Sequence, residues 1–455
     1  MFVSKKGVFK IPMLFKIPIL RVGLNHLNSG TQIAVFLGFI TLLLCLGLSG
    51  CHQIRKTPDS GTASRYLYIW MGDKDGKEDD FIAVVDVQEG SPTFGRFLAS
   101  QQVGLKGSLP HHLEYELPSP GQLLYGNAHH HELLILVDFS KPLHPRIVKT
   151  VSPPPPYRYP HDITRLPNGH VLVGYLRSEG PSPTPGDKDL PGNHGGIAEL
   201  DARGNVIRTA SAAVPSYKLP IRTYAMTPLP QLDRLVTTSA IMMETNSADV
   251  VQIWRLSDLK LLHTILAPKA LLPGGKIQPA GNWMPFEPRI MPDGSVLMNA
   301  YGCGFYRLTG IDSPKPKLEN VYTISIPSSG PSGQCAVPAI VGHYWIMPVG
   351  ALHAVISLDI SDPAHPFEVS RLVAPGEFPS HWLAKDPKSN RLILGQEVGN
   401  ENRMLMLRID PNTGKLSWDE SFRGEDGSLG LSFVRTSWPH GNTGEATGHA
   451  ALFVP

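Results

Sequence analysis

The segment HDITRLPNGHVLVGY (161–175) holds two short extended runs separated by the turn residues Pro-Asn-Gly at 167–169. Glycine readily adopts the left-handed backbone conformation that tight turns need, and the second run is rich in β-branched and aromatic residues. The segment therefore predicts a β-hairpin. Five other segments have a similar layout, although the one at 337–348 lacks the turn proline; they begin at His112, Tyr224, Phe286, Val337 and His381.

A second series of hairpins alternates with the first, each with apolar runs around Asp, Gly, Pro or Asn turn residues. Its seven members lie at 83–98, 134–151, 196–210, 252–266, 305–324, 355–373 and 405–422. The first member lacks an upstream partner, whereas the C-terminal segment 440–454 has no hairpin after it. We therefore expect an all-β fold, a seven-bladed β-propeller whose ring is closed by the C-terminal strand joining the first blade. A pair of β-sandwiches would not explain the persistent strand phase.

Composition agrees with a chain of many short strands. The 455 residues include 44 glycines and 43 prolines, and 42% of the residues are hydrophobic, which is enough for a sizeable core. The net charge of +2 gives no reason to expect nucleic acid as a partner. The sequence also lacks a P-loop, a dinucleotide-binding glycine motif, a Gly-x-Ser-x-Gly elbow and a Cys-x-x-Cys pair, so nucleotide binding and serine hydrolase chemistry have no support.

The N-terminal segment is typical of an export signal. Basic residues between 5 and 21 precede an apolar run at 33–48, and Cys51 follows in LSGC. This pattern resembles a bacterial lipoprotein signal, and an uncleaved membrane anchor is the alternative. We expect a signal peptide at 1–50, a lipidated N-terminus and linker at 51–65, and the propeller at 66–455. Lipid on Cys51 would anchor the protein to a membrane of the bacterial cell envelope, facing the periplasm, and His52 after it favours the outer membrane.

Only Cys303 and Cys335 would remain besides Cys51 after export. In an oxidising compartment these two residues could form a disulfide, or they could be two unrelated buried thiols.

Histidine recurs at one position of the first series. His112, His161 and His381 each lie six residues before a turn proline, and Tyr224 and Phe286 hold the same place in their segments. In the C-terminal segment the nine-residue spacing of His440 and His449 matches that of His161 and His170, so His440 is aligned with His161.

Equivalent positions of a propeller converge near its axis, so these histidines predict a transition-metal site, for which imidazole suits copper, zinc or iron. His111 adds to the same neighbourhood, and His353 is a further candidate ligand in a later blade. The run His129–His131 would be a peripheral metal site or only a polar turn. The alternative for each residue is a hydrogen-bonded core histidine. Asp162 would orient an imidazole, move a proton in catalysis, or cap its strand by bonding local backbone.

Several segments resemble the selenium-binding protein / methanethiol oxidase family. They are DDFIAVVDVQEGSPTFGRFL (79–98), LPHHLEYE (109–116), PHDITRLPNGHVLVGYL (160–176) and LHAVISLDISDPAHPFEVSRLV (352–373). The resemblance implies a seven-bladed propeller with a copper cofactor that oxidises methanethiol with oxygen to formaldehyde, hydrogen sulfide and hydrogen peroxide. His112 and His161 match histidines that would contact copper, and His353 matches the histidine of a Leu-His-Gly segment. No cysteine lies between Cys51 and Cys303, which argues against selenium binding.

Two other functions fit a propeller of this kind. A non-enzymatic lipoprotein would use the ring as a scaffold for a metal or a protein, because fold does not fix function. A propeller lactonase would hold calcium or zinc on the axis with carboxylates and Asn, whereas this sequence places histidine there.

Overall fold

Hairpins repeat along the whole part of the chain that the structure describes. The computed structural model describes residues 63–179, 193–242, 246–327, 334–397 and 402–455, which belong to one compact unit, Ser60–Pro455. The predicted signal segment and the lipidation site at Cys51 lie outside these residues. The described helices are three short 3-10 turns, η1 (His129–His131), η2 (Pro230–Leu232) and η3 (Gly350–Leu352), and no helix among the described residues has the length and apolar character to span a membrane.

Seven antiparallel sheets form the ring, as the sequence predicts. Blade 1 consists of β29 (Ala446–Val454), β1 (Tyr66–Asp73), β2 (Asp79–Asp86) and β3 (Phe97–Lys106). Blade 2 consists of β4 (Pro110–Leu113), β5 (Leu124–Ala128), β6 (Leu133–Asp138) and β7 (Arg146–Val151). Blade 3 consists of β8 (Tyr157–Arg165), β9 (Val171–Ser178), β10 (Gly196–Leu200) and β11 (Val206–Ser211). Blades 4 and 5 consist of β12 (Thr223–Leu229), β13 (Arg234–Ser239), β14 (Val250–Arg255) and β15 (Lys260–Leu266); and of β16 (Pro285–Ile290), β17 (Val296–Ala300), β18 (Gly304–Thr309) and β19 (Lys317–Thr323).

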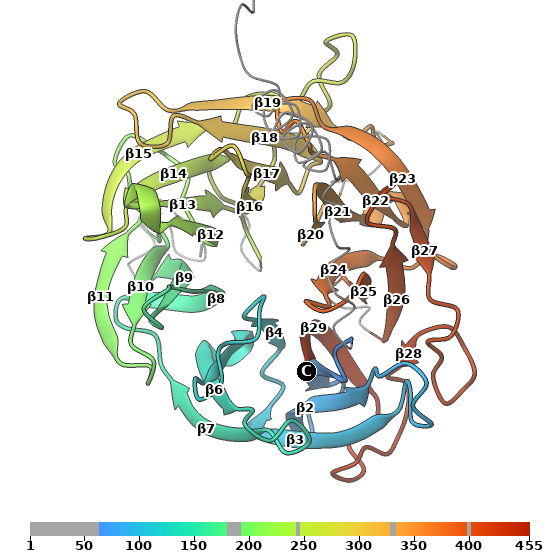
Figure 1. Cartoon of the computed structure of the whole chain (residues 1–455). Helices are drawn as coiled ribbons and strands as arrows, with labels where there is room; N and C mark the ends of the chain where they lie inside the picture. Colours follow the sequence, from blue (N-terminus) through green and yellow to red (C-terminus); the bar gives the residue numbers. More distant parts are fainter. Residues whose placement is uncertain (1–62, 180–192, 243–245, 328–333, 398–401) are drawn as a thin grey trace, which may run out of the picture. The chain divides into compact units, whose positions relative to one another are not determined.

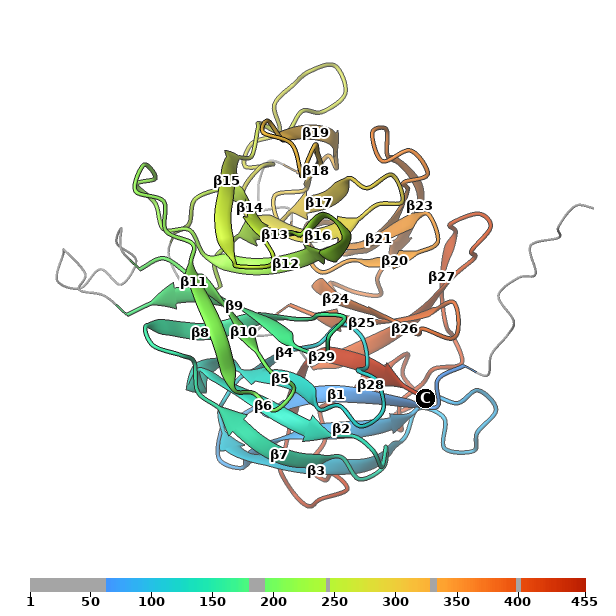
Figure 2. The ribbon, with the colours of Figure 1, turned by 60° about the vertical axis from the view of Figure 1, so that its left-hand side comes forward.

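Blades 6 and 7 complete the ring. They consist of β20 (Ala339–Val341), β21 (Tyr344–Val349), β22 (Ala354–Asp359) and β23 (Phe367–Val373); and of β24 (Ser380–Lys385), β25 (Arg391–Gln396), β26 (Arg403–Ile409) and β27 (Leu416–Trp418), with β28 (Leu431–Ser432) paired to β26. Figure 1 looks along the ring axis, with the first strand of each blade nearest the centre and the fourth at the rim. Figure 2 shows the red β29 beside the blue β1, which places the two ends of the described chain in one blade.

The turn residues act as the sequence predicts. In blade 3, Gly169 has a φ of +84° and its N–H donates to the carbonyl of Leu166, which closes the β8–β9 hairpin. At the end of the third strand in five blades, an Asp side chain accepts a hydrogen bond from the backbone N–H two residues on, so the Asp stops the strand and starts the turn. These residues are Asp86, Asp138, Asp201, Asp359 and Asp410.

Ring closure joins the C-terminal strand to the first hairpin. β29 pairs antiparallel with β1 from Tyr66↔Val454 to Asp73↔Ala446, as predicted. A buried cation reinforces the junction of blades 7 and 1: the Arg391 guanidinium pairs with Asp386 at 2.8 Å and donates to the carbonyl of Ser64 at 3.0 Å and to that of Val87. Both members of the ion pair are fully buried.

Cys303 and Cys335 form a disulfide, which decides between the two states that the sequence left open. The bond joins the turn between β17 and β18 to the segment that leads into blade 6, and both cysteines are fully buried. It therefore links blade 5 to blade 6 covalently.

We expect the Arg391→Ala substitution to lower the free energy of unfolding by about 3–5 kcal/mol, because it leaves the buried Asp386 without its cation and removes the hydrogen bonds to blade 1. The control is Arg371→Ala, which removes the exposed pair with Glu368 and is expected to cost about 1 kcal/mol or less. Urea denaturation of both variants compares them, and equal effects would show that the buried pair does not hold the junction.

Candidate metal centre at the ring axis

The innermost strands share one irregularity that brings side chains to the axis. In β4, Pro110 pairs with Ala128 and Leu113 pairs with Gly126. The two residues His111 and His112 therefore lie opposite one residue, Asn127. A β-bulge of this kind redirects side chains and is frequent beside functional sites. The same register shift occurs in five other inner strands, at His161–Asp162, Tyr224–Ala225, Phe286–Glu287, His381–Trp382 and His449–Ala450.

The residue opposite each bulge packs against the next blade. In blade 2 this residue is Asn127, whose amide oxygen accepts the N–H groups of His111 and His112 at 3.2 and 2.7 Å. Its amide nitrogen donates to the carbonyl of Pro160 in blade 3 at 2.9 Å. In blade 3 the opposite residue is Gly174, where an added Cβ would lie 2.9 Å from the carbonyl oxygen of Thr223 in blade 4. In these two blades the residue opposite the bulge is thus held against the neighbouring blade, and in blade 2 the same residue also bonds the bulge itself.

Six buried histidines meet at this level. We call His111, His112, His129, His161, His381 and His449 the histidine cluster; none is more than 3% exposed. Ring centroids lie 4.0 Å apart for His111 and His449, 4.2 Å for His112 and His161, and 5.0 Å for His381 and His449. Ring nitrogens of His111, His112 and His449 all lie within 4.8 Å of one another, a spacing at which they could hold one metal ion.

Four members of the cluster favour the neutral imidazole. Burial, and next the neighbouring imidazoles, lower the pKa values of His111 and His112 well below the usual range. The same causes bring the pKa values of His129 and His161 to about 3, even though a hydrogen bond to the carbonyl of Tyr224 raises that of His161. Neutral imidazole is the form that binds a metal.

Unpaired ring nitrogens also indicate that the cluster can bind a metal. Both ring nitrogens of His111, His112 and His129 are buried and have no hydrogen-bond partner among the described residues. In His161, Nδ1 lies 2.9 Å from the carbonyl oxygen of Tyr224, and since a carbonyl only accepts, Nδ1 carries the proton. Its Nε2 therefore offers a lone pair, and no partner for that atom is present in the described structure. Burying unpaired polar atoms is costly, and a bound metal would satisfy them.

Glu397 fixes one edge of the cluster. Its carboxylate lies 2.6 Å from His381 Nδ1 and accepts the hydroxyl of Tyr301 at 3.1 Å. Burial alone would raise the pKa of Glu397, but the charge of His381 outweighs this effect and lowers that pKa to about 2. A carboxylate that orients an imidazole in this way is a common support for a metal ligand.

A second polar group lies next to the cluster. The carboxylate of Glu287 accepts the hydroxyl of Tyr115 at 3.1 Å and pairs with Arg289 at 3.0 Å. Asp162 is fully buried; burial, with the charge of Glu287, raises its pKa to about 7. Its Oδ2 accepts the hydroxyl of Thr164, whereas its Oδ1 has no partner in the described part of the chain.

The structure brings four predicted histidines together, His111, His112, His161 and His381, and leaves two apart. His440 precedes β29 and is held by Ser100 and Thr443, each 2.6 Å from one of its ring nitrogens. Aligning His440 with His161 by histidine spacing was therefore wrong, because His449 occupies the bulge of that strand. His353 ends the turn η3 with a φ of +46°, and no ring contact joins it to the cluster among the described residues.

Two cluster members, His449 and His129, were not predicted from the sequence to lie at the axis. His449 lies in the apolar run ATGHAALFV, which marks it as part of the inner strand, whereas His440 lies among turn residues. His129 belongs to the run that the sequence analysis treated as a peripheral site or polar turn. His129 is buried in the cluster, whereas His130 and His131 are exposed and lie near backbone carbonyls at the surface.

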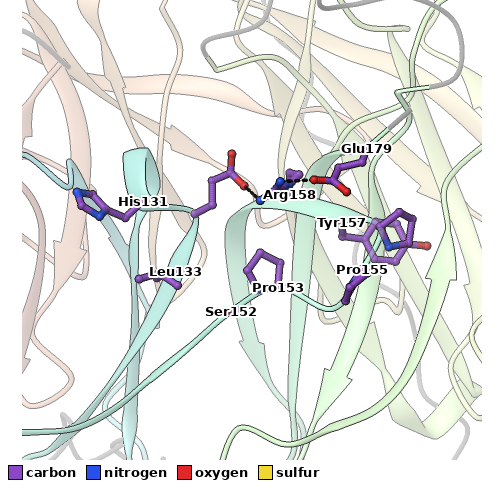
Figure 3. Close-up of a pocket in the computed structure, with 10 residues that line it drawn as sticks. His131, Leu133, Ser152, Pro153, Pro155, Tyr157, Arg158 and Glu179 are labelled. Atoms are coloured by element: carbon purple, nitrogen blue, oxygen red, sulfur yellow. Dashed lines mark hydrogen bonds and ion pairs between the residues drawn. The ribbon is translucent and has the colours of Figure 1, made fainter. Parts of the chain in front are cut away.

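A separate pocket of about 250 Å³ lies on the surface between blades 2 and 3. Arg158 pairs with Glu132 at 2.9 Å and with Glu179, and Figure 3 shows the pair with Glu179 and the nearby Pro153 and Pro155. The pocket shares no lining residue with the histidine cluster. Its Glu and Arg side chains all belong to these two ion pairs, whereas the histidine cluster holds buried nitrogens without partners, so we assign the candidate site to the axis.

Comparisons with known proteins support the fold alone. No protein-family profile and no curated protein sequence matches the chain. A solved structure described as a hypothetical selenium-binding protein from Sulfolobus tokodaii is 16% identical, with a TM-score of 0.66 over 86% of this chain and 93% of that one. The periplasmic gluconolactonase of Pseudomonas aeruginosa is 12% identical, with a TM-score of 0.59 over 86% of this chain and 99% of that one. The chain is thus similar in fold to β-propellers of different activity.

We expect the metal-free protein to lose stability as the pH falls from about 6.5 toward 3. In the unfolded chain a histidine binds a proton near pH 6.5, whereas His129 and His161 stay neutral in the folded protein down to about pH 3. At pH 5 each such residue would lower the free energy of unfolding by about 2 kcal/mol relative to pH 8. Urea denaturation at both pH values measures the change.

The control is His129→Phe, which removes one of these groups. It should lower the number of protons that the chain takes up on unfolding at pH 5 by about one. An unfolding free energy that is equal at pH 8 and pH 5 would contradict buried neutral imidazoles.

Proposed function

We propose that this protein is a copper-dependent oxidase of a small thiol, anchored in the bacterial cell envelope and facing the periplasm. The observation that carries the proposal is that the buried imidazoles of His111, His112 and His161, which have unpaired ring nitrogens, converge with the imidazole of His449. Nitrogen ligands of this kind suit copper, and also zinc or iron. The resemblance of the sequence to the methanethiol oxidase family supports copper among these metals.

His111, His112 and His449 would hold the metal, with His161 beside them, and His381 would be positioned by Glu397. Copper would supply the redox chemistry that moves electrons from a bound thiolate to oxygen. The bulges fix the direction of the imidazoles before any ligand arrives, so little reorganisation is needed on binding.

Asp162 is the group that we assign to proton movement. It follows His161 in the same bulge, and its buried Oδ1 could take the thiol proton when the substrate binds. A carboxyl group with a pKa of about 7 accepts and releases protons near neutral pH, which suits general acid–base work. For methanethiol the balanced reaction consumes oxygen and water and gives formaldehyde, hydrogen sulfide and hydrogen peroxide.

The location in the envelope is supported by the disulfide. Disulfides form and persist in oxidising compartments and are rare in the cytosol, so the Cys303–Cys335 bond agrees with export. Lipid on Cys51 would then hold the exported protein to a membrane. The Cys51→Ala variant is expected to lose the incorporation of labelled palmitate that the wild-type protein shows; a variant that still incorporates the label would contradict lipid on Cys51.

The test of the metal site is copper analysis and EPR on the full-length protein in detergent. We expect about one copper per chain with nitrogen hyperfine structure, and a loss of at least tenfold in affinity when His112 and His161 are both changed to Ala. His440→Ala is the matched control, because His440 is hydrogen-bonded away from the cluster and its loss should leave copper binding unchanged.

Oxygen uptake with methanethiol tests the activity. The double variant is expected to consume oxygen at less than about 1% of the wild-type rate. A folded protein that stays free of metal after copper reconstitution would overturn the oxidase and leave a non-enzymatic scaffold. A protein that binds copper but consumes no oxygen with any thiol would point to metal binding without catalysis.

A further inference from the structure

Two aromatic rings lead from the histidine cluster to a buried carboxylate. The ring of Trp382 lies 4.9 Å from that of His112, nearly perpendicular to it. The ring of Tyr115 stacks on Trp382 with a centroid distance of 5.5 Å and an interplanar angle of 5°. The Tyr115 hydroxyl then donates to Glu287 at 3.1 Å. The four side chains form one continuous series of contacts from a candidate ligand to a proton acceptor.

We propose that Trp382 and Tyr115 form a redox relay, in which Tyr115 holds one oxidising equivalent beside the histidine cluster and Glu287 holds the phenol proton. This inference rests on the proposed function and extends it to residues outside the ligand set. Oxidation of a phenol releases an electron and a proton together, so a tyrosine used in this way needs a base at hydrogen-bond distance, which Glu287 supplies.

The chemistry of the proposed substrate calls for such a group. Oxidation of a thiol to an aldehyde removes two electrons, and reduction of oxygen to hydrogen peroxide takes two electrons, whereas a single copper exchanges one. Oxygen would take one electron from Tyr115 through Trp382, one from copper and two protons from the solvent to give hydrogen peroxide, while the phenol proton moves to Glu287. When the thiol is oxidised with water to the aldehyde and hydrogen sulfide, one electron would return to Tyr115, which recovers its proton from Glu287, the other would return to the metal, and two protons would go to the solvent.

The surroundings of Tyr115 distinguish it from the other tyrosine that bonds a carboxylate near the axis. The hydroxyl of Tyr301 also donates to a carboxylate, that of Glu397, but its ring lies 5.3 Å from that of Phe286 and 6.1 Å from that of Trp283. Among the described residues no ring contact joins Trp283 to the histidine cluster, whereas Trp382 contacts His112 directly. Tyr115 packs on tryptophan, the aromatic side chain best suited to pass an electron. The guanidinium of Arg289 lies 4.9 Å from the Tyr115 ring centroid and 3.0 Å from Glu287, so it holds both partners in place.

EPR on the copper-loaded, full-length protein tests the relay. Titration with hexachloroiridate, a one-electron oxidant, is expected to remove about one electron per copper and to give an organic radical signal, or to abolish the cupric signal through coupling to that radical. Tyr115→Phe is expected to take up at least tenfold less of the oxidant while binding copper with unchanged stoichiometry. Tyr125→Phe is the matched control, since Tyr125 is buried between blades 2 and 3 and its hydroxyl bonds the carbonyl of Asp201.

Two further variants separate the relay from a structural role. Glu287→Gln keeps a hydrogen-bond acceptor for Tyr115 but is a far weaker base, so it is expected to reduce radical yield about tenfold. Trp382→Phe keeps an aromatic ring and is expected to slow radical formation without changing copper content. A copper-loaded, thiol-oxidising Tyr115→Phe protein that takes up the full oxidising equivalent would overturn the relay alone. A wild-type protein that binds no copper would overturn both the relay and the oxidase.

Discussion

Pairing between β29 and β1 is the interaction on which the rest of the structure depends. Four-stranded sheets arranged around an axis leave exposed edges and a gap unless the last blade contacts the first. Here the first blade is assembled from both ends of the described chain, and Arg391 joins it to blade 7 through buried hydrogen bonds. Closure fixes the position of every inner strand relative to the axis, and those strands carry the histidine cluster.

The bulges convert this fixed ring into a site. A regular strand alternates its side chains between two faces, so only one of two adjacent residues would point in a given direction. In a bulge, two residues of one strand lie opposite a single residue of its partner, and this changes the direction of their side chains. Contacts such as those of Asn127 keep the bulge in one conformation. Burying imidazoles with unpaired nitrogens lowers the free energy of unfolding of the metal-free protein. A metal bound to these nitrogens would stabilise the folded state.

The sequence predicted the blade number, the closing strand and the position of His112, His161 and His381, because turn residues and strand phase are local signals that recur. It wrongly placed His440 rather than His449 in the last inner strand, because the nine-residue spacing of the two histidines matches that of His161 and His170 but does not show which of them lies in the strand. It also could not predict the Tyr115–Glu287 hydrogen bond, because this bond joins residues of blades 2 and 5, which meet only across the axis of the ring. The Cys303–Cys335 disulfide stayed one of two alternatives, because composition does not show whether two cysteines 32 residues apart come into contact.

The order of synthesis gives the closing strand one more consequence. His449 is made after every other member of the histidine cluster, and it arrives in the strand that completes blade 1. A polypeptide interrupted before β29 would lack both the edge partner of β1 and one of the three nitrogens that converge within 4.8 Å. Incomplete chains would therefore bind a metal only weakly. A bound metal would then mark chains whose synthesis and folding had reached the last blade.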